Sequence, residues 1–363
     1  MLQLSVEEMV ARARADLRIG APIALVSASG GALVLAAETA RAERLDDLRR
    51  LAPAGLDLAV SHRRADTLRA RAYDGDISRI AVPAEADLGW VRATADPSLD
   101  LAHPLRGPYR SRREGAAGLH RLAIALAKQA RLLPAAVVVP LADVAGRADA
   151  EGLSRVSAGD LAASGDAARA LRRVASAPVP LEASETARVH VFRPEDGAEE
   201  HYAIEIGAPS RREPVLSRLH SACFTGDLLG SLKCDCGPQL RAALTQVGAA
   251  GAGVLLYLNQ EGRGIGLANK MRAYALQSQG FDTVEANHRL GFEDEERDFA
   301  LGAAMLREMG FEAVRLMTNN PAKARAMEVA GLHVAERVPL MVGLNPHNRR
   351  YLDTKRAKSG HLL

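Results

Sequence analysis

Three cysteines lie in one short stretch, and they are the only cysteines in the 363 residues of the chain. Cys223, Cys234 and Cys236 have the spacing Cys-x10-Cys-x-Cys, which differs from the paired Cys-x2-Cys knuckles of structural zinc sites. Three thiolates with no certain fourth protein ligand suit a Zn²⁺ ion that keeps one position open for water. Such an ion lowers the pKa of its bound water from about 15.7 toward about 7 and so provides a nucleophile at neutral pH.

Two other interpretations of the thiols remain open. They could be small buried side chains without a ligand, or His220 could complete a closed Cys3His structural site. An odd number of cysteines in a chain without an export signal argues against a disulfide framework. The polar motifs near the thiols favour the metal.

A predicted strand at 254–257 leads into a loop that contains Glu261, Arg263 and three glycines. Glycine lets a ligand approach the backbone closely, so this loop is typical of a binding site. The glycine spacing does not match the dinucleotide-binding fingerprint, and a glycine-rich turn after a strand is weak support when taken alone.

A second candidate binding segment, Thr318–Lys323, follows a predicted strand at 314–317. Pro321 suits the first turn of a helix, whose amino end offers backbone amides. Thr318 adds a hydroxyl and Lys323 a positive charge, a combination that suits an oligophosphate. Ordinary capping of a strand-to-helix turn is the alternative.

Two more polar groups lie between these segments. Tyr274 falls on a predicted helix at 269–277, where its phenol could hydrogen-bond a reacting group or simply pack. Arg297 follows four acidic residues at 293–296, a pattern that favours an acidic helix start with a surface ion pair.

The predicted helices and strands that carry these residues indicate an α+β protein of two domains, each a mixed sheet with packed helices. The length exceeds one ordinary core, and 48% hydrophobic residues supply apolar material for two. Segment 175–187 lacks periodicity and carries two prolines, so a linker is predicted there, between domains at 1–178 and 188–363. The patterns predict helices after a cap at Ser5 and at 45–51, 63–71 and 115–132, and strands at 22–26, 32–36, 56–60, 134–140, 189–192 and 201–206.

The charge balance and hydropathy limit the partners. Lys and Arg number 47 against 44 Asp and Glu, and a formal net charge of +3 is too small to indicate nucleic-acid binding. No charged-then-apolar leader follows Met1, and no apolar run approaches the roughly 20 residues of a membrane helix. We therefore expect a cytoplasmic protein that binds neither nucleic acid nor membrane.

The second half resembles GTP cyclohydrolase II over about residues 188–363. The resemblance implies the first step of riboflavin biosynthesis, in which GTP is hydrolysed to formate, pyrophosphate and 2,5-diamino-6-(5-phosphoribosylamino)pyrimidin-4-one. It implies one Zn²⁺ per chain, whose bound hydroxide attacks C8 of the guanine ring, Mg²⁺ with the GTP phosphates, and a homodimer. Besides the cysteines, the matching motifs are Arg218-Leu-His-Ser, Gln260-Glu-Gly-Arg263, Arg272-Ala-Tyr-Ala-Leu276, Glu296-Arg-Asp-Phe299, Thr318-Asn-Asn-Pro321 and Tyr351-Leu-Asp-Thr-Lys355.

Carried onto this sequence, the resemblance implies roles for single residues. The cysteines become zinc ligands, Tyr274 assists ring opening, and Arg297 acts at the α-phosphate, where a guanidinium is better suited to be an electrostatic clamp than a nucleophile. Glu295 takes the place of an aspartate proton acceptor, and Ala222 replaces an acidic residue often found before the first zinc cysteine. Neither change removes a metal ligand or a phosphate cation, so we expect activity to be retained. The positions that match GTP-binding residues are Arg218, Gln239, Glu261, Arg263, Thr283, Thr318 and Lys323.

The first half resembles 3,4-dihydroxy-2-butanone 4-phosphate synthase. That family holds Mg²⁺ and a sugar phosphate with an acidic loop and a Gly-His-Thr-Glu motif. Here the corresponding turn at 27–31 has no carboxylate, and Leu119 and Arg121 stand at the His and Glu positions of the motif. We expect a degenerate domain without synthase activity, kept as scaffold or for dimerisation or regulation. The matching segments are Gly20-Ala-Pro-Ile, Leu33–Glu38, His103-Pro-Leu-Arg106 and Leu126–Ala135.

Two rival functions remain. The chain could be a regulatory or scaffolding pseudoenzyme that binds GTP in the flavin pathway, or a related hydrolase that opens the GTP ring to a different product. Retention of all three thiols, Tyr274, Arg297 and Lys323 argues against the pseudoenzyme.

Overall fold

The computed structural model describes residues 4–27, 30–167, 169–360 and 362. It divides into two compact units. Unit 1 comprises Met1–Gly165 and Ala268–Glu296, and unit 2 comprises Asp166–Leu267 and Arg297–Leu363. Segment 268–296 thus belongs to unit 1, although the sequence analysis placed it in the second domain. Within the described residues, no helix combines the length and the apolar character needed to cross a membrane.

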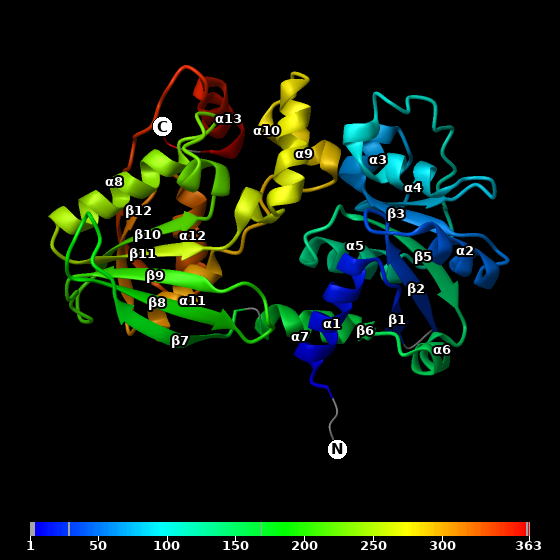
Figure 1. The fold of residues 1–363 in the computed structure, drawn as a ribbon, viewed down its shortest axis with the longest axis horizontal. Coiled ribbons are helices and arrows are strands. Elements are labelled where there is room, and N and C mark those ends of the chain that lie inside the picture. Colours follow the sequence, from blue (N-terminus) through cyan, green and yellow to red (C-terminus); the bar gives the residue numbers. More distant parts are fainter. Residues whose placement is uncertain (1–3, 28–29, 168, 361, 363) are drawn as a thin grey trace. The chain divides into compact units, whose positions relative to one another are not determined.

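Unit 1 is built on a six-stranded sheet in the order β4-β3-β5-β2-β1-β6 (Figure 1). β1 runs parallel to β6 and antiparallel to β2, so the sheet is mixed. Its strands are β1 Ile23–Ser27, β2 Gly30–Ala36, β3 Asp57–Ser61, β4 Ile77–Ala81, β5 Ala135–Leu141 and β6 Arg155–Ser157. Its helices are α1 Val6–Ile19, α2 Ala42–Leu51, α3 His62–Leu68, α4 Leu88–Ala95, α5 Gly118–Gln129, α6 Val144–Glu151, α9 Leu267–Ser278 and α10 Thr283–Leu290; α7 Ala158–Ala167 crosses the boundary to unit 2.

Apolar side chains cover both faces of this sheet. Leu17 of α1 and Leu126 of α5 pack on one face, whereas Leu48 of α2 and Val91 of α4 pack on the other. The run of buried β-branched residues in β5 is typical of a strand covered on both sides. Unit 1 is therefore a three-layer domain.

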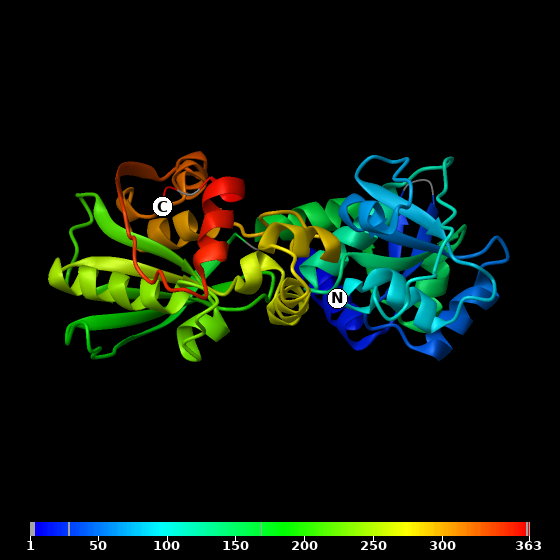
Figure 2. The same cartoon turned by 90° about the horizontal axis from the view of Figure 1, so that it is seen from above.

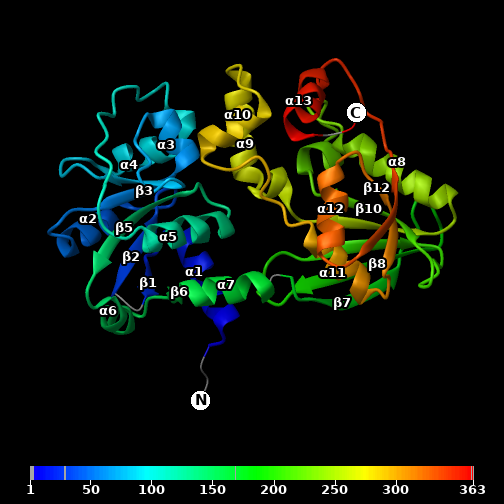
Figure 3. The same cartoon turned by 180° about the vertical axis from the view of Figure 1, so that it is seen from behind.

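Unit 2 is built on a seven-stranded mixed sheet in the order β13-β12-β10-β11-β9-β8-β7. α8 covers one face, and α11 and α12 cover the other (Figures 2 and 3). The strands are β7 Leu171–Pro178, β8 Ala187–Pro194, β9 His201–Ile206, β10 Val215–Ser221, β11 Gly253–Leu258, β12 Ala313–Met317 and β13 His333–Val338. The helices are α8 Cys236–Ala249, α11 Ala300–Glu308, α12 Pro321–Val329 and α13 Arg349–Ser359.

Most predicted elements are confirmed, and the fold is α+β with mixed sheets as expected. Ser5 caps α1 in a capping box with Glu8. The strands predicted at 22–26 and 32–36 form the β1–β2 hairpin; residues 28 and 29 of the predicted turn lie outside the described part of the chain.

Two local predictions were wrong. The linker predicted at 175–187 begins inside β7, an edge strand whose largely exposed residues pair with β8. Prolines are tolerated at the end of an edge strand, which explains why the composition suggested a linker. The acidic helix start predicted before Arg297 is a loop, and α11 begins only at Ala300.

Candidate active site

Three parallel strands of unit 2 bring the predicted site segments of that unit to one edge of its sheet. β10 pairs with β11 on one side and with β12 on the other, both in parallel. The carboxyl ends of parallel strands meet at the same edge, where open sheets bind their ligands. Cys223 follows β10, Glu261 follows β11, and Thr318–Lys323 follows β12. Figure 1 labels these three strands in unit 2.

The three thiols lie together. Their sulfur atoms are all within 4.8 Å of one another, and Cys223 Sγ and Cys234 Sγ are 3.8 Å apart. Two thiolates on a tetrahedral zinc, with Zn–S of about 2.3 Å, are separated by about 3.8 Å. The spacing of this pair therefore fits a zinc ion without rearrangement.

Glycine at position 226 leaves the space beside the thiols open. A Cβ atom on Gly226 would lie 2.8 Å from Cys234 Sγ and 3.0 Å from Cys223 Sγ. A Cβ on Gly237 would lie 2.2 Å from the Gly226 carbonyl oxygen, so two glycines allow the two cysteine turns to approach. This cradle accommodates a metal ion but no additional side chain.

Without a cation the thiols resist ionisation. Hydrogen bonding with Cys223, together with burial, raises the pKa of Cys234 to about 11. The pKa of Cys236 is raised well above its usual range, chiefly by its two neighbouring thiols. Cys236 also begins α8, and the amino end of a helix favours a negative charge. A bound dication would be the main source of stabilisation for three clustered thiolates.

His220 does not join the thiol cluster. Its Nε2 lies 3.1 Å from both carboxylate oxygens of Asp227, and burial lowers the pKa of the imidazole. Asp227 also accepts hydrogen bonds from the Tyr257 hydroxyl and from the Cys223 amide, at 3.0 and 2.9 Å. The Cys3His alternative is therefore wrong for this structure, because among the described residues the cluster of possible ligand atoms holds the three sulfur atoms and no nitrogen of His220. Asp227 was not predicted, because its only signal in the sequence is an acid four residues after a candidate ligand.

Two cations gather below the end of β10. Arg297 donates to the Ser221 hydroxyl at 3.4 Å, and Lys323 donates to the Leu219 carbonyl at 3.1 Å. Both stand over the ring of Phe299, at 5.0 and 5.2 Å from its centre. Residues far apart in sequence thus place two positive charges beside the strand that leads to Cys223.

A third cation, Arg218, is buried within the same strand. It donates to the Met317 carbonyl and to the side-chain oxygen of Gln239, which in turn donates to Asp235. Burial lowers the pKa of Arg218 to about 10, so the guanidinium stays charged at neutral pH. Among the described residues, its buried Nε has no hydrogen-bond partner, which leaves a donor in the site.

Glu261 joins the glycine-rich loop to the turn at Phe224–Leu228, which follows Cys223 and is called the metal loop below because of its proposed ligand. Its carboxylate accepts from the Phe224 amide at 2.6 Å and from the Gly262 amide at 2.9 Å. Arg263 has a left-handed backbone, with φ of 64°, which is unusual for a residue with a side chain. Strain of this kind is concentrated at functional loops.

The turn after β12 is shaped chiefly by ordinary helix capping, which was the alternative to the predicted phosphate site. Asn320 caps α12 through the Ala322 amide, and Pro321 occupies the first turn as expected. The Thr318 hydroxyl accepts from the Asn320 amide and is buried. Thr318 thus shapes the turn, while Lys323 supplies the charge.

The remaining predicted residues belong to unit 1. Tyr274 lies on α9 with the Lys270 ammonium 5.6 Å from its ring centre. Thr283 begins α10 and accepts from Gln277 at 3.4 Å. Glu295 lies in the exposed part of the loop that follows α10. The structure thus gathers the predicted residues in two sets, one in each unit.

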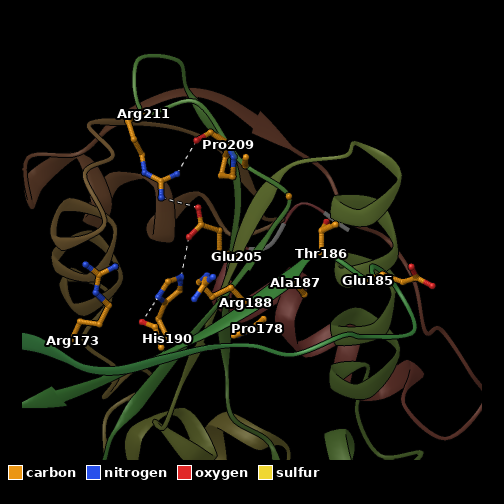
Figure 4. A pocket seen from close by; sticks show the side chains of 13 residues that line it. Arg173, Pro178, Glu185, Thr186, Ala187, Arg188, His190, Glu205, Pro209 and Arg211 are labelled. Carbon is orange, nitrogen blue, oxygen red and sulfur yellow. Dashed lines mark hydrogen bonds and ion pairs between the residues drawn. The ribbon is translucent and has the colours of Figure 1, made fainter.

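A separate pocket of about 950 Å³ opens over β7, β8 and β9 (Figure 4). Its floor holds His190, whose Nδ1 lies 2.7 Å from the Ser176 hydroxyl and whose Nε2 lies 2.9 Å from the Glu205 carboxylate. Arg211 donates to the second oxygen of Glu205 at 2.7 Å. None of the residues predicted for catalysis or GTP binding lines this pocket.

The three clustered thiols, which could hold a metal ion, and the cations at the end of β10 together make a candidate active site. The family model for GTP cyclohydrolase II matches residues 172–339. The GTP cyclohydrolase-2 of Azospirillum brasilense is 45% identical over 361 residues, which are 98% of this chain and 94% of that protein. That of Cronobacter sakazakii is 56% identical over 193 residues, covering 53% of this chain and 98% of that protein. This chain belongs to the GTP cyclohydrolase II family, and it is an enzyme of the hydrolase class.

Solved structures show a weaker likeness. A two-domain 3,4-dihydroxy-2-butanone 4-phosphate synthase from A. baumannii is 19% identical, covers 93% of this chain and 100% of its own, and has a TM-score of 0.35. Similarity at this level is too low to assign a fold or a function.

Proposed function

We propose that this protein hydrolyses GTP to formate, pyrophosphate and 2,5-diamino-6-(5-phosphoribosylamino)pyrimidin-4-one, at one Zn²⁺ ion held by Cys223, Cys234 and Cys236. The observation that carries the proposal is the thiol cluster, whose 3.8 Å sulfur separation fits zinc, beside two cations at the end of β10. A zinc ion bound by three protein ligands supplies an activated water for attack on an electrophilic carbon.

The cations of unit 2 suit the triphosphate. Arg297 and Lys323 converge on Phe299 and would hold phosphate oxygens as a pair. Mg²⁺ would accompany these oxygens, since a hard cation prefers oxygen ligands. We assign Arg297 the role of an electrostatic clamp, because a guanidinium stays protonated and is a poor nucleophile.

The polar side chains around the thiols are of the kind that could bind the purine base of GTP. The buried Nε of Arg218 has no partner in the part of the chain that the structure describes, and Gln239 lies within hydrogen-bonding distance of both Arg218 and Asp235. Glu261 and Arg263 stand on the loop that meets the metal loop. We assign these four residues to recognition of the base and ribose, and Thr318 to the shape of the phosphate turn.

The residues of unit 1 complete the assignment by resemblance. Tyr274 would assist ring opening, Glu295 would accept a proton, and Thr283 would contact GTP. For residues 188–363 the proposed domain function is cyclohydrolase, and for residues 1–178 it is a synthase-like domain without activity. We also propose a cytoplasmic homodimer that binds neither nucleic acid nor membrane.

The test is to incubate zinc-loaded protein with GTP and Mg²⁺ and to measure formate, pyrophosphate and the pyrimidine. We expect all three in equal amounts. A Cys234→Ser variant is the control, and formate no higher than in this control would reject hydrolysis. GTP binding without formate would favour the pseudoenzyme, and formate with another pyrimidine would favour a related ring-opening hydrolase.

A further inference from the structure

Segment 268–296, which carries Tyr274 and Glu295, is part of unit 1 and not of the unit that holds the thiols. It enters unit 1 as α9, continues as α10 and ends in the loop before Arg297. Its contacts with residues 1–165 are specific and charged, which calls for an explanation in a first half expected to be inactive.

Arg272 is the first anchor. Its Nε donates to Asp96 and one terminal nitrogen donates to Glu38, both at 3.0 Å. All three side chains are largely shielded, with 22%, 16% and 16% exposure. A guanidinium held by two carboxylates in different directions has a fixed position, and Tyr274 follows two residues later on the same helix.

The two carboxylates are themselves held in place. Glu38 accepts the Leu133 amide at 2.8 Å through its other oxygen, and Asp96 accepts the Ser98 amide at 2.9 Å. The first half therefore presents a fixed receptor for Arg272. Such pre-organisation is what a positioning role requires.

The second anchor lies at the other end of the segment. Arg63 donates to Glu293 at 2.9 Å, and Lys128 donates to Glu296 at 2.6 Å. These two carboxylates flank Glu295 in the chain. Residues of the first half thus restrain the backbone on both sides of the proposed proton acceptor.

A close backbone approach completes the contact. Gly291 has a φ of 91°, and a Cβ there would lie 2.8 Å from Ser61 Oγ and 2.9 Å from Pro134 Cγ. Asn269 is fully buried and donates to the Arg131 carbonyl at 3.1 Å. The segment is fitted to residues 1–165 by shape as well as by charge.

We propose that the first half of the chain serves as a positioning scaffold for the segment that carries Tyr274 and Glu295. Glu38, Asp96, Arg63 and Lys128 are positioning residues, because each acts through the segment and not on the substrate. The kinetic part of this proposal rests on the proposed function, whereas the anchoring itself does not.

The test uses the full chain with Glu38→Gln and Asp96→Asn combined, which removes two charges and keeps acceptor oxygens for the Leu133 and Ser98 amides. We expect amide hydrogen exchange across α9 to rise at least tenfold and kcat at saturating GTP to fall at least tenfold, with zinc content unchanged. Asp74→Asn is the matched control, because Asp74 also binds an arginine with both oxygens and this partner, Arg79, lies in the first half of the chain.

A second variant separates positioning from general damage. Arg272→Met removes the same contacts from the opposite side. We expect the triple variant, Arg272→Met combined with Glu38→Gln and Asp96→Asn, to lose no more kcat than Arg272→Met alone, because all three changes break one set of ion pairs. The proposal would be overturned if amide exchange in α9 and kcat of the double variant equalled those of Asp74→Asn. Additive losses of kcat in the triple variant would also overturn it. Faster exchange with unchanged kcat would overturn the positioning role. Absence of formate from the unaltered protein would reject the proposed function, while the exchange measurement would still test the anchoring.

Discussion

At the residue scale, the thiol centre depends on a glycine as much as on its cysteines. The cysteines together with the polar motifs near them predicted a metal site, but no pattern could predict that Gly226 lies among the sulfur atoms. That position follows from the five-residue π-helical turn Phe224–Leu228, whose geometry depends on contacts from β11 and its loop. Asp227 was missed for the same reason.

Gly226→Ala should therefore empty the site. The added methyl would lie within 3.0 Å of two sulfur atoms, so we expect zinc to fall from about one per chain to well below half. Elemental analysis after dialysis measures this. Gly118→Ala is the control, because a Cβ at Gly118 meets no atom within 4 Å; equal zinc in both variants would contradict the geometry.

Arg297 gives a second prediction at this scale. As a clamp, it should be partly replaced by lysine, which keeps the charge and loses the planar fork. We expect kcat to fall about tenfold in Arg297→Lys and about 10²- to 10³-fold in Arg297→Met. A covalent role predicts something else, namely complete loss of pyrophosphate release in both variants with formate release preserved.

At the scale of elements, the sequence predicted the buried ones well and the edge ones poorly. β5 and α5 were found because their hydrophobic periodicity is complete. β7 was taken for a linker because an edge strand has no such pattern, and its pairing with β8 is visible only in three dimensions. The site segments after β10, β11 and β12 were each predicted singly, but their meeting depends on the sheet order.

His190, in the pocket over β7, β8 and β9, gives a prediction of how the stability of unit 2 depends on pH. Burial lowers the pKa of His190, although Glu205 opposes the effect by hydrogen bonding. The unfolded chain therefore binds more protons below about pH 6.5 than the folded one does, so His190 reduces the stability of unit 2 as pH falls through that value. Thermal unfolding of the unaltered protein and of His190→Gln is measured between pH 5 and 8. The difference between their melting temperatures should become smaller as the pH falls. Parallel curves would contradict the assignment.

At the scale of the whole molecule, the chain joins a cyclohydrolase sequence to a first half for which we propose a scaffold role. The boundaries of the two units could not be predicted. Segment 268–296 lies inside the part of the chain that matches the cyclohydrolase family, but its contacts place it in unit 1. Long-range ion pairs such as Arg272 with Glu38 leave no local signal in a sequence. The scaffold role proposed above depends on such pairs.

The first half should not convert ribulose 5-phosphate to a four-carbon phosphate and formate. Leu119 packs against the core of unit 1, and Arg121 donates to Asp76 at 2.8 Å, so neither position offers a metal ligand. Incubation with ribulose 5-phosphate and Mg²⁺ should yield no product above a protein-free blank. Catalytic turnover would show that other residues hold the metal.

The central claim, that three thiols hold the zinc that hydrolyses GTP, is tested most directly by titrating Zn²⁺ into metal-free protein while measuring the rate of formate release. We expect a rate that rises linearly and reaches its plateau at about one zinc per chain, with no activity at any zinc level in Cys234→Ser. Full activity without zinc, or a plateau unaffected by Cys234→Ser, would contradict it.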